Sequence, residues 1–414
     1  MNTAPAARLD LAYARSQFPA LAGETVFLDN AGGSQVLKGV VDRIGDYLLE
    51  TNVQQGASYP VAQRSAARLY EAQLRALELF GARRPEEIVM GPSSTLLLQL
   101  LARGLAGRIR PGDQVVVTRI DHESNIGPWV GLGALGVEVR FWEMDREGLG
   151  LNLADLDRLM TERTRLVCFT HASNILGSET SLVEITRFVH ARGSQVCVDG
   201  VAYAPHRAVD VVGWDVDYYV LSFYKVYGPH HAALYGKYDH LLGLANLYHY
   251  FIGEDRIPYK LQPGNPNYEL SYGAAGIADY LAELGTRSGA APSATRRQRI
   301  EAAFDAIADH EAALAERLLG YLRSKPRVRV IGSPQVDAAR LPTISFVVQD
   351  TDPEAVVCHI DALGIGIRFG DFHSRRLVDH LGLTPRKGVV RVSLVHYNTL
   401  DEVERLVRGL EQVL

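Results

Sequence analysis

The spacing of the apolar positions changes along the chain, and each spacing predicts a different kind of element. Residues 36–82 carry Val40, Ile44, Tyr47 and Leu48 at helical spacing, which predicts a mainly helical segment. From about residue 86 to 240, short apolar runs alternate with amphipathic stretches. The runs predict strands over residues 114–118, 137–142, 165–170, 195–198 and 218–221.

The amphipathic stretches between these strands predict helices. Residues 182–191 have the apolar pattern of a helix, and Gly193 ends it. An alternation of strands and helices favours a mostly parallel sheet with helices on both faces. Ligands bind such sheets beyond the carboxyl ends of the strands, so the polar residues that follow the strands are candidates for a site.

The pattern changes again after about residue 290. The residues predict a long helix over 292–322 with one or two breaks, and a shorter helix over 352–363. The last helix begins at Thr399, and Glu402 three residues later completes a capping-box pattern. These helices are joined by predicted strands over residues 327–331, 343–348, 365–368 and 389–394. The order predicts an α+β domain, with its junction in residues 286–299.

Composition narrows the class of protein. Of the 414 residues 47% are hydrophobic and 22% charged, which excludes a disordered chain or a disulfide-stapled mini-domain. The net charge of −5 and the lack of a dense basic run predict no nucleic-acid or membrane partner. The first residues lack the apolar core of a signal peptide, so a soluble cytoplasmic protein is expected. No metal site is predicted, and Cys168, Cys197 and Cys358 are expected to be buried free thiols.

Several strand ends carry polar residues that suit chemistry. The segment 91–94 places two serines before a helix, as in an anion site. Each segment alone has a simpler reading as a helix cap, a turn or a solvated lysine. Together they supply a phosphate cradle, an aromatic ring, a carboxylate and a lysine, which suits pyridoxal 5′-phosphate (PLP). The other strand-end segments are residues 121–125, 171–174, 199–200 and 222–225.

The chain resembles the class V aminotransferase family of fold-type I PLP enzymes, and in particular its cysteine desulfurase and selenocysteine lyase branch. Eight segments carry the resemblance in family order, over nearly the whole chain. They are FLDNAGG (27–33), DHESNIGPW (121–129), HASNILG (171–177), VDGVAYAPH (198–206), SFYKVYGP (222–229), QPGNPN (262–267), IRFG (367–370) and VRVSLVHYNT (390–399).

This resemblance implies a fold and a domain division. The fold class is α/β, with a mostly parallel seven-stranded sheet in a large domain and a smaller α+β C-terminal domain. Residues 25–285 would form the large PLP-binding domain and residues 286–414 the small domain. Residues 1–24 would be an N-terminal segment that packs with the small domain.

The resemblance also implies roles at the cofactor ring. Lys225 would form the Schiff base and, once freed by substrate, move the α-proton. Asp199 would pair with the pyridine nitrogen, and His122 would stack on the ring. Asn174 would lie near the ring hydroxyl and the substrate carboxylate. Arg391 would bind that carboxylate with its two-pronged guanidinium group.

Further residues are implied at the phosphate. Ser93, Ser94 and Ser222 would hold it. Asn265 would reach the phosphate of the neighbouring subunit, which implies a homodimer with shared active sites.

The chain departs from the family at positions that matter for the reaction. Cysteine desulfurases carry a persulfide-forming cysteine shortly after an Arg-x-Gly, and here His373 stands at that position. The residue before the lysine is Tyr224, where desulfurases have histidine, and Ala202 replaces a glutamine. An early loop has Ser58 where the family has histidine. The chain thus resembles a branch that lacks the catalytic cysteine.

Three functions remain open on the sequence. The first is a PLP-dependent β- or γ-lyase of the C–S or C–Se type that acts at the α-carbon of an amino acid with a β- or γ-leaving group, a small-molecule substrate, with His373 or Tyr224 as a general acid. The second is a class V aminotransferase or an epimerase. The third is a non-catalytic PLP-binding protein.

Overall fold

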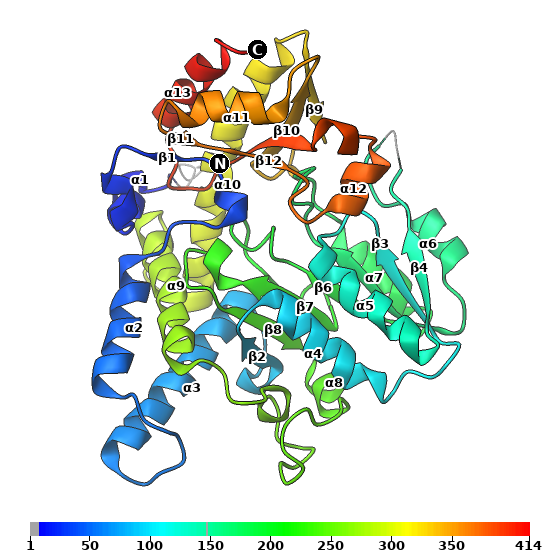
Figure 1. The fold of residues 1–414 in the computed structure, drawn as a ribbon. Helices are drawn as coiled ribbons and strands as arrows, with labels where there is room; N and C mark the ends of the chain where they lie inside the picture. The colour runs from blue at the N-terminus through cyan, green and yellow to red at the C-terminus, as the bar shows by residue number, and fades with distance from the viewer. Residues whose placement is uncertain (1–7, 146–147) are drawn as a thin grey trace, which may run out of the picture.

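A seven-stranded sheet forms the centre of the computed structural model, which describes residues 8–145 and 148–414 (Figure 1). The strand order is β2-β8-β7-β6-β5-β3-β4, and β8 runs antiparallel to the other six strands. This confirms the predicted α/β class. The strands are β2 (Ile88–Gly91), β3 (Gln114–Thr118), β4 (Glu138–Trp142), β5 (Thr164–Thr170), β6 (Gln195–Asp199), β7 (Tyr218–Ser222) and β8 (Ala232–Gly236).

Apolar residues on both faces of this sheet explain why its strands read as continuous apolar runs. Successive side chains of a strand point to opposite faces. In β6, Val196 and Val198 pack into one core, and Cys197 packs into the core on the other face. Because both faces are buried, β3, β5, β6 and β7 carry few polar residues before their carboxyl ends.

Helices cover each face of the sheet. One core contains apolar residues of α2 (Lys38–Glu50), α3 (Pro60–Phe80), α7 (Leu182–His190) and α9 (Tyr268–Arg287). The other contains residues of α4 (Ser94–Ala106), α5 (Gly127–Gly131) and α8 (Tyr238–Leu242). The shorter helices elsewhere are α1 (Leu11–Ser16), α6 (Leu153–Leu159) and α12 (Arg375–His380).

A second, antiparallel sheet lies in the C-terminal part, at the top of Figure 1. Its order is β12-β13-β10-β9, and α11 (Pro353–Asp361) and α13 (Leu400–Leu410) share a core with it. The strands are β9 (Val328–Ile331), β10 (Thr343–Val348), β12 (Arg368–Gly370) and β13 (Val389–Ser393). The capping box of Thr399 and Glu402 is confirmed.

Strand β1 (Val26–Phe27) pairs in parallel with β11 (Ile365–Gly366) as a separate two-stranded sheet, and Val26 and Ile365 pack into the core of the small sheet. Helix α10 (Arg296–Arg323) contributes Ile307 to the core of the large sheet and Leu314 to the core of the small sheet. The boundaries proposed after residues 24 and 285 stay a prediction.

The structure corrects some sequence-based predictions. Helix α10 is unbroken and begins at Arg296, because Thr295 and Gln298 form a capping box there and no proline follows within the helix. The strand predicted over residues 365–368 is two short strands, β11 and β12. Cys168 and Cys197 are buried free thiols as expected, but Cys358 is exposed on α11. Within the described residues, no helix is long and apolar enough to cross a membrane.

Candidate active site

A cavity lies at the carboxyl ends of β5, β6 and β7. This is where a mostly parallel sheet places its ligand site. The cavity brings together six of the site residues predicted from the sequence: Ser94, His122, Asn174, Asp199, Tyr224 and Lys225. The other lining residues are Thr95, Ser124, Thr170, Ala172, Val201 and Ala202.

Lys225 ends a short turn after β7 and is buried. Burial and the positive charge of Arg391 lower the pKa of its amine to about 8, although Asp199 and Asp29 oppose the shift. A substantial fraction of the amine is therefore unprotonated slightly above neutral pH. An unprotonated lysine amine is a nucleophile for a carbonyl group.

Asp199 is the last residue of β6, and its side chain is almost fully buried. Burial raises the pKa of this carboxyl group, while the Val201 amide and the charge of Lys225 act in the opposite direction. Val201 N donates to Asp199 Oδ1 at 2.9 Å. Among the described residues no group donates to the second carboxylate oxygen, which faces the cavity and can accept from a ring nitrogen.

His122 follows β3 and presents a neutral imidazole to the cavity. Burial, with the positive charge of Lys225, lowers its pKa to about 3. Ser124 N donates to His122 Nδ1 at 3.1 Å, which fixes the ring. A neutral, fixed aromatic ring suits stacking on a planar ligand.

Hydroxyl groups gather at the start of α4. Ser222 Oγ donates to Ser94 Oγ at 3.0 Å, and Thr95 Oγ1 lies 2.7 Å from Ser124 Oγ. Ser93 instead caps the helix, where its side chain accepts from Leu96 N at 3.1 Å. Thr95 and Ser124 were not singled out from the sequence, although they adjoin motif residues. Hydroxyls at a helix N-terminus suit a phosphate group.

Arg391 lies on β13 with only 2% of its surface exposed. Burial lowers the pKa of its guanidinium to about 10, but Asp29 supports the charge. Arg391 Nη2 donates to Asp29 Oδ1 at 3.0 Å, and Nη1 donates to the Asn174 carbonyl at 3.3 Å. Within the described residues, Arg391 Nε has no hydrogen-bond partner. One buried donor of Arg391 is therefore left without a protein partner, although Arg391 does not line the Lys225 cavity and its guanidinium lies 3.6 Å from the centre of the Phe372 ring.

Asp29 was missed as a site residue, although it lies in the FLDNAGG motif. Its carboxylate accepts from Arg391 and lies 3.6 Å from Arg368 Nε. Nothing in the local sequence shows that residue 29 meets residue 391, because β1 and the loop after it reach the C-terminal sheet only in the folded chain.

The loop after β12 carries His373 at the edge of the site. The His373 ring lies 5.2 Å from the His122 ring, between ring centres, and is exposed to solvent. Asn174 holds this loop, because its Nδ2 donates to the Phe372 carbonyl at 3.0 Å and its Oδ1 accepts from Ser374 Oγ at 2.7 Å. Tyr224 stacks on His230, with ring centres 5.2 Å apart.

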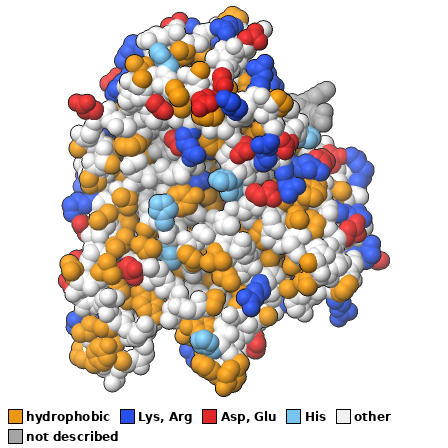
Figure 2. Space-filling model, viewed as in Figure 1, with side chains coloured by type: hydrophobic (Ala, Val, Ile, Leu, Met, Phe, Trp, Pro, Cys, Tyr) orange, Lys and Arg blue, Asp and Glu red, His pale blue; other side chains and the backbone are white. Residues whose placement is uncertain are grey.

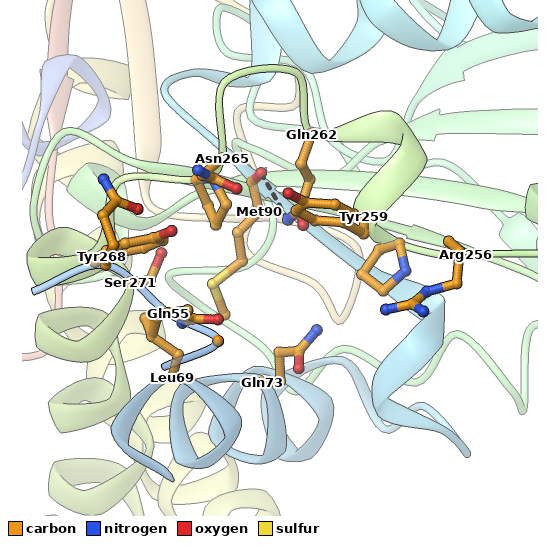
Figure 3. Close-up of a pocket in the computed structure, with 14 residues that line it drawn as sticks. Gln55, Leu69, Gln73, Met90, Arg256, Tyr259, Gln262, Asn265, Tyr268 and Ser271 are labelled. Carbon is orange, nitrogen blue, oxygen red and sulfur yellow. Dashed lines mark hydrogen bonds between the residues drawn. The ribbon is translucent and has the colours of Figure 1, made fainter. Parts of the chain in front are cut away.

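Asn265 lies away from this cavity and lines a second, larger one (Figure 3). Figure 3 shows Asn265 and Tyr268 on one side of this space and Leu69 and Gln73 of α3 below it. Within the single chain, Asn265 therefore does not take part in the Lys225 cavity.

These residues fit PLP. The Lys225 amine and the Asp199 carboxylate line the same cavity, and the hydroxyls at the start of α4 line its rim.

A family model then identifies the chain. The model described as aminotransferase class V matches residues 26–406. The chain belongs to the class V aminotransferase family.

Similar proteins agree with this assignment. The chain is 43% identical to the aminotransferase-like protein FGM3 of Gibberella zeae, over 97% of each chain. It is 30% identical to the cysteine desulfurase-like protein ustD of Aspergillus flavus, over 98% of this chain and 91% of ustD. The apo structure of a cysteine desulfurase from Thermococcus onnurineus aligns over 100% of this chain and 99% of its own, with a TM-score of 0.86 and 25% identity.

The family defines the cofactor and the fold type. The chain is a PLP-dependent enzyme of fold type I, as the resemblance implied. The roles of the individual residues and the reaction are taken up next as proposals.

Proposed function

We propose that the chain acts at the α-carbon of an amino acid through a Schiff base with Lys225, as a β- or γ-lyase of the C–S or C–Se type. The observation that carries the proposal is the placement of Lys225. The Lys225 amine is buried and has a lowered pKa. Asp199 and Asn174 line the same cavity, and the buried Arg391 donates to the Asn174 carbonyl.

Bound PLP supplies an aldehyde that takes the amino group and a ring that accepts the electrons of a broken bond at the α-carbon. Arg391 binds the substrate carboxylate through Nε, and its link to the Asn174 carbonyl orients the guanidinium. Lys225 Nζ takes the proton from the α-carbon, because its low pKa leaves it unprotonated for this role. Asp199 keeps a proton on the ring nitrogen.

The cysteine positions support release of the side-chain fragment without a persulfide. Cys168 and Cys197 are buried in the sheet and Cys358 is on α11. The loop with His373 contains no cysteine. The leaving group therefore takes a proton from His373 or Tyr224, which are the acids at this edge of the cavity.

A second function is aminotransferase or epimerase activity, which also begins with removal of the α-proton. The name of the 43% identical relative, aminotransferase-like, favours it. It would leave the side chain of the substrate intact, so product analysis separates it from the lyase. The buried Arg391 argues against a non-catalytic role, because a protein that only binds PLP does not need a buried guanidinium group to bind a substrate carboxylate.

Replacing His373 tests the general acid. We expect His373→Asn to lower kcat about a hundredfold, because an amide cannot transfer the proton. Asparagine also tolerates the positive φ of this residue, which is 60°. The absorption spectrum of bound PLP should not change.

Arg375→Ala is the matched control, because Arg375 lies two residues further on at the start of α12, where its exposed side chain pairs with Asp371 and Asp379. Unchanged kcat in His373→Asn would remove His373 from the mechanism.

We also propose a homodimer in which Asn265 completes the partner's phosphate site. The second cavity and exposed apolar residues support this arrangement. Tyr250, Phe251 and Leu49 are 96%, 68% and 87% exposed. Figure 2 shows apolar side chains gathered at the lower end of the molecule, where Figure 1 places the ends of α2 and α3.

Mixed dimers give a direct test of shared sites. We expect Asn265→Ala to weaken PLP binding about tenfold, because a hydrogen bond to a charged group is lost. A dimer of one Lys225→Ala chain and one Asn265→Ala chain would then contain one fully native site. The mixture should therefore regain native PLP binding at part of its sites. No recovery in mixed dimers would show that Asn265 does not act across the interface.

A further inference from the structure

Asp121 is a buried carboxyl group that the mechanism above does not use. It follows β3 and exposes 1% of its surface. Within residues 8–145 and 148–414, no lysine, arginine or histidine forms an ion pair with it, and the one charged group that shifts its pKa is Asp199, another carboxylate. A buried carboxylate without a cation is costly, so the group must be stabilised in another way.

Hydrogen bonds satisfy both oxygens of this carboxyl group. Asn125 Nδ2 donates to Asp121 Oδ1 at 2.7 Å, and the Thr118 hydroxyl forms a hydrogen bond with Oδ2. The Thr170 backbone amide also interacts with the carboxyl group. Asp121 therefore ties the end of β3 to Asn125 and lies beside the end of β5.

The same hydrogen bonds reach His122. Asn125 N donates to the His122 carbonyl at 2.9 Å. Trp129 Nε1 donates to Asn125 Oδ1 at 3.2 Å, so the Asn125 amide is fixed at both ends. The backbone of His122 is thus held between Asp121 and Asn125, and its ring position depends on both.

The neighbouring carboxylate determines which acid carries the charge. Asp199 on β6 pairs in register with Thr170 on β5, the residue whose amide interacts with Asp121. Two carboxylates in a dry site cannot both ionise at low cost. The positive charge of Lys225 stabilises the ionised form of Asp199, whereas no cation among the described residues does this for Asp121.

The direction of the pKa shift agrees with this geometry. Burial and the charge of Asp199 raise the pKa of Asp121 to about 8, against the opposing effect of Thr118 and Asn125. Cys168 also faces Asp121, but burial raises the pKa of that thiol, so it brings no charge. His122 is neutral as well.

We infer that Asp121 is a positioning residue that works as a neutral carboxylic acid, holding the loop of His122 and leaving Asp199 as the one charged carboxylate at this end of the cavity. In this state the Asp121 hydroxyl donates to Thr118 Oγ1 and its carbonyl oxygen accepts from Asn125. The inference rests on the proposed cofactor site.

Infrared difference spectra of the full chain test the protonation directly, with and without PLP. Wild type minus Asp121→Asn should show a protonated-carboxyl band at neutral pH, and in wild type this band should disappear as the pH rises through about 8. Asp113→Asn is the control at the other end of β3. Burial favours the protonated form of Asp113, but the Arg110 amide and Arg165 outweigh burial and lower the pKa of this carboxyl group. Asp113→Asn should therefore lose no such band. A carboxylate band in the Asp121 difference spectrum would overturn the inference.

PLP affinity tests the positioning. Asparagine reproduces the neutral acid, because its oxygen accepts from Asn125 and its amide donates to Thr118. Asp121→Asn should hold PLP within about twofold of wild type, whereas Asp121→Ala should bind about tenfold more weakly and lose visible circular dichroism of the bound cofactor. Equal loss in both variants, or none in Asp121→Ala, would contradict the positioning role. Absence of PLP binding in wild type would instead contradict the proposed function, since the infrared band does not depend on the cofactor.

Discussion

Replacing Lys225 with alanine is expected to lower turnover at least about a thousandfold, because the variant loses both the nucleophile and the base. The folded structure should survive, since alanine removes a buried amine whose pKa is lowered by burial. The measurement is borohydride reduction of the PLP-loaded enzyme followed by mass spectrometry. Wild type should carry covalently fixed cofactor, and Lys225→Ala should carry none.

The chain provides an internal control for this labelling. Lys260 is also fully buried, but its amine donates to the Leu242 and Leu244 carbonyls at 2.9 and 2.7 Å and lies outside the Lys225 cavity. Peptide mapping should find the cofactor on the peptide that contains Lys225 and leave the Lys260 peptide unlabelled. Cofactor fixed elsewhere in Lys225→Ala would refute the assignment of the Schiff-base lysine.

Replacing Arg391 with lysine is expected to reduce kcat/KM about a hundredfold, mainly through a higher KM for the amino acid. Lysine keeps the positive charge but loses the planar fork that bonds a carboxylate with two donors. Because Arg391 also holds Asp29 and the Asn174 carbonyl, part of the loss will come from a less ordered site. The absorption band of bound PLP should remain, which separates substrate binding from cofactor binding.

Arg368 is the matched control for charge near Asp29. It pairs in register with Arg391 across β12 and β13 and lies 3.6 Å from Asp29, but 58% of its side chain is exposed. Arg368→Ala should change KM by less than about threefold, because exposed ion pairs contribute little. If Arg368→Ala raised KM more than Arg391→Lys does, the substrate carboxylate would have to be assigned to Arg368 instead.

The sequence predicted most strands of the large and small sheets, and missed β2 and β8. Strand β3 was predicted with its observed bounds because a buried run of valines is bounded by a turn and a polar strand end. Strands β2 and β8 went unnoticed, since each is an apolar run that ends in glycine and not in a polar residue that marks a strand end. Pairing with β7 makes β8 a strand, and that contact is tertiary.

Some contacts of the site could likewise be predicted from the sequence, and others could not. Lys225 and Asp199 follow predicted strands, so their meeting at one sheet edge could be foreseen. The contact of Asp29 with Arg391 joins positions 362 residues apart, and no local pattern contains it. Ser93 was placed with Ser94 at the phosphate by motif alone. In the structure the Ser93 side chain caps α4, because the first backbone amides of this helix need a hydrogen-bond acceptor.

Product analysis after mixing the PLP-loaded enzyme with L-cysteine, and in parallel with L-alanine, tests the proposed lyase reaction most directly. Elimination from cysteine should release pyruvate and sulfide in equal amounts, with no product from alanine, which has no leaving group. Deuterium from the solvent at the α-carbon, or conversion of the cofactor to its amine form, with the side chain intact and no sulfide released, would contradict the lyase and identify an epimerase or an aminotransferase.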